Sequence, residues 1–201
     1  MQGKEININD VREKYRRGNW LLFSRDSVCL QELIQLICLQ KHRTIVMWIF
    51  ECVEQPVALL KSHYAEERRP EEAIHLCKLW AEGKVKMPIA KKALLQVHTM
   101  AKELKDPVEI TLCHAVGQAC ATVHVETHAV GFVFYELTAI VQKMGIDDCE
   151  YALENKIEKY LSSLKSWQDR IDTRTYQWAD FLADDSGVNK ERQLWEKRLK
   201  E

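Results

Sequence analysis

Three of the seven histidines, His114, His124 and His128, lie in one short stretch. If that stretch is a continuous helix, His124 and His128 lie about 40° apart around the axis, and two imidazoles so placed can bind one metal ion. His114 would lie about 15 Å along the axis from His124, too far to share that ion. A complete site needs a ligand from another helix, such as His98 or His75, so the possible metal set is His124, His128 and His98.

The spacing of these histidines differs from that of zinc proteases. The sequence reads His-x-Glu-x-His, whereas those enzymes use His-Glu-x-x-His. On a helix, Glu126 would lie about 200° around the axis from His124. The simpler interpretation is that the histidines are partly buried and hydrogen-bond to the backbone or to acids. This interpretation requires no metal and no cofactor, and we adopt it as the expectation.

Four β-branched residues just before His128 weaken the continuity of the helix: Thr122, Val123, Val125 and Thr127. Thr127 could instead cap a new helix over residues 128–144. In that case His124 and His128 would lie at a junction between two helices, and the argument from helical spacing would lapse. The sequence leaves both possibilities open.

A cysteine nucleophile is the other chemistry to consider, because Cys113 precedes His114. Neighbours on a helix point about 100° apart, so this adjacency does not let the histidine activate the thiol. The seven cysteines form no CxxC pair and mostly occupy apolar helical positions, as reduced and packed thiols do. No phosphate-binding loop or serine elbow is present, so the sequence favours a protein that is not an enzyme.

Two tryptophans are candidates for an interface. Trp178 and Trp195 lie in poorly periodic or charged surroundings, and partly exposed aromatic residues are favoured interface anchors. The alternative is that the C-terminal stretch folds back and buries both rings.

Small side chains dominate the segment that carries the histidines. Residues 112–125 contain no charged residue other than histidine, and small residues let a neighbouring helix backbone approach closely. We therefore predict a central helix surrounded by others, with close contacts at Gly117, Ala121 and Gly131.

Prolines mark several helix starts. Pro70, Pro88 and Pro107 suit the first turn of a helix, where a missing N–H costs no hydrogen bond. Gly83 suits a left-handed end for the helix that begins near Pro70. Further starts are predicted at Thr44 and at two capping boxes, residues 106–109 and 147–150, and Pro56 predicts a kink or a restart.

No strand-like alternation persists along the chain, so the predicted fold is all-α. We expect one domain, a helical array or bundle of about 7–9 helices with short loops. Residues 1–43 would form a helical lead, 44–186 the core with the histidine motif, and 187–201 a charged helix or tail.

Composition excludes several classes of function. The 201 residues carry a formal net charge of −1, whereas nucleic-acid-binding domains are usually basic. No apolar run is long enough to span a membrane, and the N-terminus lacks the apolar core of a signal peptide. We therefore expect a cytoplasmic protein that binds neither nucleic acid nor membrane.

The central motif resembles a known family. Residues 117–131 read Gly-Gln-Ala-Cys-Ala-Thr-Val-His-Val-Glu-Thr-His-Ala-Val-Gly. This resembles the signature Gly-Gln-Ala-x-Ala-Thr-x-His-Val-x-Thr-His-Ala-x-Gly of the Imm-five-like immunity proteins. Upstream, Arg69-Pro70 with Ala73-Ile74, Trp80-Ala81-Glu82-Gly83, and Trp48 with Cys52 are similar to further segments of that family. Glu67 stands where the family usually has Asp, and the resemblance covers roughly residues 43–168.

The resemblance implies an α-helical protein that binds and neutralises a bacterial toxin, and it implies no catalytic residues. The motif residues with a structural or binding role would be His114, Gly117, Gln118, Thr122, His124, Thr127, His128 and Gly131. Two alternatives stay open. One is a histidine- or metal-dependent enzyme with a pocket near His98, His114, His124 and His128. The other is a helical scaffold that self-associates, for example as a homodimer, through an interface made of the long helix after residue 147 and the charged tail.

Overall fold

The computed structural model describes residues 6–173 and 175–200, and within these ranges it contains helices and no strand. The helices are α1 (Asn9–Arg16), η1 (Val28–Leu30), α2 (Gln31–Cys38), α3 (His42–Cys52), α4 (Glu54–His63), α5 (Arg69–Ala81), α6 (Met87–Glu103), α7 (Pro107–Ala121), α8 (Thr127–Met144), α9 (Glu150–Arg170), α10 (Asp180–Ala183) and α11 (Lys190–Arg198). The predicted all-α class is confirmed. The structure has more helical segments than the predicted 7–9. Val53 divides α3 from α4, residues 122–126 divide α7 from α8, and α10 is a single turn.

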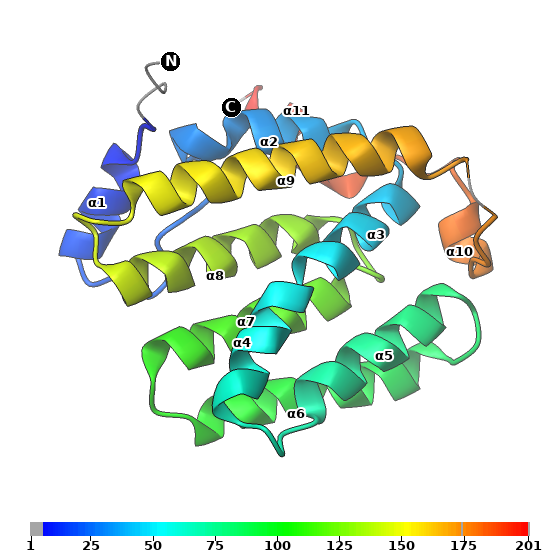
Figure 1. Ribbon diagram of the computed structural model, residues 1–201. Coiled ribbons are helices and arrows are strands. Elements are labelled where there is room, and N and C mark those ends of the chain that lie inside the picture. Colours follow the sequence, from blue (N-terminus) through cyan, green and yellow to red (C-terminus); the bar gives the residue numbers. More distant parts are fainter. Residues whose placement is uncertain (1–5, 174, 201) are drawn as a thin grey trace.

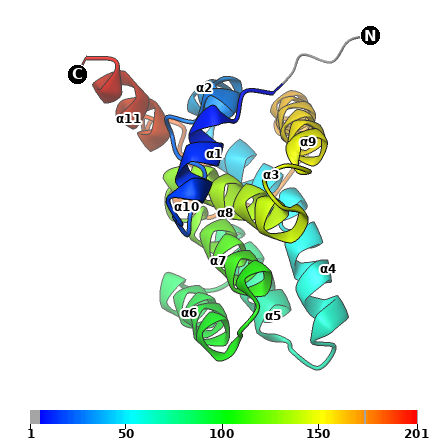
Figure 2. The same cartoon turned by 90° about the vertical axis from the view of Figure 1, so that its left-hand side faces the viewer.

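Helix α7 lies at the centre of the molecule. It packs against α3, α4, α5, α6 and α8. Figure 2 shows α6, α7 and α8 stacked in a row, with α2 and α9 beyond α8, and Figure 1 shows α9 running along that outer layer. The prediction of a central helix is confirmed for residues 107–121, whose small side chains allow neighbours on several sides.

The proline starts are confirmed. Pro70, Pro88 and Pro107 each lie in the first turn of their helix. Val53 separates α3 from α4, and Pro56 lies in the first turn of α4, so the predicted restart is present. Gly83 has φ 75° and ends α5 as predicted.

Of the residues predicted to cap helices, only Asp106 does so, at the start of α7. Its carboxylate accepts hydrogen bonds from the backbone N–H groups of Val108 and Glu109. The box is not reciprocal, because the Glu109 carboxylate accepts instead from the Tyr64 hydroxyl and pairs with His63. Tertiary contacts therefore replaced half of the predicted motif.

Three predicted caps are wrong, and each has a physical reason. Thr44 is buried inside α3, which begins two residues earlier. Helix α9 begins at Glu150 with Cys149 at its cap position, so Asp147 lies too early to cap it, and Arg12 of α1 binds the carboxylates of Asp147 and Glu150 at 3.0 and 2.7 Å. Thr127 is the first residue of α8 rather than its cap, and the cap position has no side-chain hydrogen bond.

The core between α3, α8 and α9 is aromatic and contains one buried ion pair. Trp48, Phe132 and Tyr160 are almost fully buried, and both other rings meet Tyr160 edge-on. Glu136 of α8, 4% exposed, pairs with Lys156 of α9 at 2.5 Å and also accepts from the Tyr160 hydroxyl. The core thus joins apolar packing to a buried charged contact.

Side-chain hydrogen bonds attach helix α11 to α2. Asn189 caps α11, and its amide donates to the carbonyls of Ile37 and Gln40. Arg25 binds the carboxylate of Glu191, which is 1% exposed.

Among the helices of the described ranges, none has the length and apolar character to cross a membrane.

Candidate functional site at the turn between α7 and α8

The histidine motif is split by a turn. Helix α7 ends at Ala121 and α8 begins at Thr127, so His124 and His128 are not neighbours on one helix. His124 is exposed, whereas His128 is half-buried. In the two ranges described above, no three His, Cys, Asp or Glu side chains come together as metal ligands. The possible set of His124, His128 and His98 is thus not assembled.

One side of the turn packs α8 onto α7. The Nδ1 atom of His128 lies 2.8 Å from the Gln118 amide oxygen, which fits donation by an Nδ1–H group. A Cβ atom on Gly131 would lie 2.5 Å from that oxygen. Gly131 therefore leaves the space in which Gln118 meets His128, and these motif residues act together as a contact between helices.

A second contact joins α6, α7 and α8. The rings of His98 and His114 lie 5.6 Å apart, and His114 lies 5.3 Å from the ring of Tyr135. Gly117 admits His98, since a Cβ atom there would lie 2.7 Å from the ring. The predicted close contacts at Gly117 and Gly131 are thus present, but each receives a side chain rather than a helix backbone.

Replacing Gly117 with alanine should lower the free energy of unfolding by about 1–2 kcal/mol. The overpacking cost outweighs the helix propensity that alanine gains, because the imidazole of His98 must leave its place against His114. Urea denaturation measures the change. Gly187→Ala, in the segment between α10 and α11, is the control for the added methyl group, since nothing lies within 4 Å of a Cβ there. Equal stability of both variants would contradict this account.

Burial lowers the pKa of several histidines below 6.5: His42, His98, His114 and His128. The unfolded chain then binds protons before the native state does, so stability is lost as pH falls through about 6.5. We expect the free energy of unfolding to fall between about pH 7 and about pH 5. Glu136, with a raised pKa, acts in the opposite sense.

Comparing the wild type with His114→Gln measures how much His114 contributes to the pH dependence of stability. The variant should lose less stability than the wild type over the same pH range, because a glutamine does not titrate. Denaturation curves at each pH provide the measurement. An unchanged slope in the variant would show that His114 is not part of the effect.

The outer side of the turn lines a cavity of about 790 Å³. In this outer cavity the ring of His124 stacks on Trp80 at 6.3 Å, and Trp80 lies 5.6 Å from the ring of Phe181. The Nε2–H group of His42 donates to the Thr122 carbonyl at 2.7 Å, and its Nδ1 faces Glu126 at 3.8 Å. Of the four histidines of the predicted enzyme pocket, only His124 lines this cavity.

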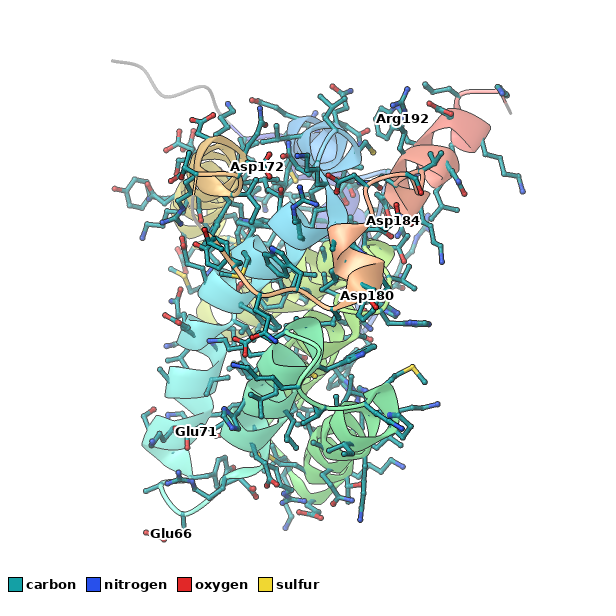
Figure 3. All side chains as sticks on the ribbon, turned by 90° about the vertical axis from the view of Figure 1, so that its right-hand side faces the viewer. Glu66, Glu71, Asp172, Asp180, Asp184 and Arg192 are labelled. Carbon is teal, nitrogen blue, oxygen red and sulfur yellow. The ribbon has the colours of Figure 1, made fainter. Side chains whose placement is uncertain are left out.

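A smaller cavity of about 420 Å³ lies between α3, α5, α9 and residues 176–178. This aromatic cavity is lined by Phe50, Trp167, Tyr176 and Trp178, with Glu51, Glu54, Glu82 and Lys78 among the polar residues. Figure 3 looks onto the face where the chain runs from Asp172 to Asp180. Trp178 and Trp195 are both half-buried against the core, and Trp195 lies apart, near Cys38 and Leu39. Their use in an interface stays a prediction.

The cysteines lie in surroundings that disfavour a nucleophilic thiolate. Burial raises the pKa of Cys113 to about 12, and the same cause raises the pKa of Cys52. All seven cysteines are free thiols. The structure therefore gives Cys113 no activated character.

The fold and the site define an all-α protein built around a histidine-bearing hairpin, α7 and α8, with the outer cavity at its turn. A family model described as Imm-5 like putative immunity protein matches residues 35–163, and the chain belongs to that family. The match runs from α2 into α9 and contains the whole hairpin. No curated protein and no solved structure is detectably similar to the chain.

Proposed function

We propose that this protein is a cytoplasmic immunity protein that binds and neutralises a bacterial toxin without catalysing a reaction. The observation that carries the proposal is membership of the immunity protein family. The geometry supports it in a second way. Most motif residues join α6, α7 and α8, whereas the exposed His124 lines the outer cavity and is accessible to a partner.

The scaffold alternative has less support in the packing. Its proposed seam requires the apolar stripe of α9, but Leu153, Ile157 and Leu164 are buried, and α9 packs against the chain's own α2, α3 and α8. What α9 offers a second copy is its outer, polar face, where Tyr151 is exposed.

Co-expression with the proteins encoded beside its gene, screened for toxicity to the host cell, tests the proposal. The purified protein should form a stable complex with one of them, and cells that make both should grow where cells that make the toxin alone do not. Isothermal titration then gives affinity and stoichiometry. If none of these proteins binds and none is neutralised, the proposal is wrong. Destruction of the toxin at catalytic ratios would instead establish an enzyme.

A further inference from the structure

We propose that the aromatic cavity receives an arginine or lysine side chain projecting from the protein partner. This inference rests on the proposed function, because it names the chemistry by which the partner is held. Its support comes from the rings of the cavity, from its carboxylates and from the way its wall is fixed.

The rings form a connected aromatic surface. Tyr176 lies 6.4 Å from the ring of Trp167 and 5.6 Å from that of Trp178. The protein already places its own cations against rings here. The ammonium of Lys78 lies 5.6 Å from the centre of Phe50, and the guanidinium of Arg170 lies 3.7 Å from the centre of Trp167. Aromatic faces attract cations through their negative quadrupole. The remaining faces, on Tyr176 and Trp178, suit an incoming cation.

Carboxylates outnumber ammonium groups in the lining. Glu51, Glu54 and Glu82 line the cavity, against Lys78 alone. Glu51 is occupied by Arg170 and Trp167, and Glu82 pairs with the exposed Lys84. Glu54 forms no ion pair with any residue that the structure describes. Its carboxylate is therefore available to a partner.

The end of α5 adds to this preference for a cation. Ala81, the last residue of α5, lines the cavity, and the C-terminal end of a helix carries partial negative charge. Beyond the cavity, Figure 3 shows Asp180 and Asp184 projecting from the same side, and neither pairs with a cation among the described side chains. A basic partner would be steered toward this face.

The wall of the cavity is held in place before binding. The backbone N–H of Ala179 donates to the Ala81 carbonyl at 2.8 Å. Gly83 lies directly against this residue, since a Cβ atom there would be in van der Waals contact with Ala179 at 3.4 Å. Trp178 is therefore fixed beside α5, and a preformed wall lowers the entropy cost of binding. The volume of about 420 Å³ lies in the range of sites that bind small groups.

A short peptide tests the cation preference without knowledge of the partner. Acetyl-Gly-Arg-Gly-amide is titrated into the full-length protein while NMR follows the indole N–H signals of Trp167 and Trp178. We expect both signals to shift. The same peptide with citrulline, a neutral analogue of arginine, should bind with an affinity at least about fivefold lower. Equal binding of the two peptides, or no shift at millimolar arginine peptide, would overturn the proposal.

Substitutions locate the peptide. Trp178→Leu and Glu54→Gln should each weaken the arginine peptide, and Glu54→Gln changes an exposed residue, so it keeps the fold. Trp195→Leu, the same change at another half-buried tryptophan, should leave binding unchanged. Equal effects of Trp178→Leu and Trp195→Leu, or an unaltered affinity in Glu54→Gln, would show that the peptide binds elsewhere.

The same variants separate this inference from the proposed function. In the toxin complex, Trp178→Leu should weaken affinity about tenfold or more, as expected of an aromatic anchor. A toxin that binds wild type and Trp178→Leu equally would leave the immunity function standing and remove the cavity from it. A protein that binds the arginine peptide but none of the toxins would keep the cavity site and lose the function.

Discussion

Replacing Lys156 with methionine should lower the free energy of unfolding by about 3–5 kcal/mol at neutral pH. The substitution preserves volume but leaves the carboxylate of Glu136 buried without its cation. Tyr160 continues to donate to that carboxylate, yet a single hydroxyl does not replace the ion pair. Urea denaturation followed by circular dichroism measures the loss.

The pH dependence of this variant identifies the cause. Burial raises the pKa of Glu136 even in the wild type, and Lys156 opposes that shift. Without Lys156 the folded pKa rises further above the unfolded value of 4.5. The native state then holds the proton more tightly, so stability falls as pH rises through the folded pKa and recovers at acidic pH. A deficit that does not depend on pH would contradict this account.

Two further variants serve as controls for the ion pair. The double variant Lys156→Met with Glu136→Gln should recover most of the lost stability, because no unpaired buried charge remains. Lys165→Met, on the same helix, removes a pair whose side chains are 58% and 72% exposed and should change stability by less than about 1 kcal/mol. A large effect of Lys165→Met would show that α9 tolerates no such substitution.

Replacing Trp48 with alanine should also cost about 3–5 kcal/mol. Its side chain is fully buried between helices and meets Tyr160 edge-on at 5.8 Å. Trp48→Phe should cost much less, because the indole N–H has no acceptor among the described residues and phenylalanine removes that buried donor. Trp20→Ala, at a ring that is 46% exposed, provides the control and should have a small effect. Equal losses in Trp48→Ala and Trp48→Phe would mean that the N–H is satisfied.

Local sequence signals predicted the helices well and their caps poorly. The prolines and the small residues of α7 act within one helix or at its direct neighbours, so their consequences could be read from the sequence. The failed capping box at residues 147–150 involves a distant residue. Asp147 and Glu150 bind Arg12, more than a hundred positions away, and no local rule contains that contact.

The candidate site shows the same division. The motif drew attention to His124 and His128. The β-branched residues before His128 indicated, as one of two possibilities, the break that divides α7 from α8. His42 was missed, because its bond to Thr122 spans 80 positions and its own surroundings carry no motif. The aromatic cavity was likewise not predicted, since Phe50, Trp167 and Trp178 line one cavity only in the folded chain.

The end of α9 and the segment that follows it lie outside the family match. The family match ends at residue 163, whereas Trp167, Tyr176, Trp178 and Phe181 lie beyond it. The matched helices thus carry the histidine hairpin, whereas three of the four rings that line the aromatic cavity, Trp167, Tyr176 and Trp178, come from residues after the match. Under the proposed function, substitutions after residue 163 would change the chemistry of the cavity and leave the hairpin sequence untouched.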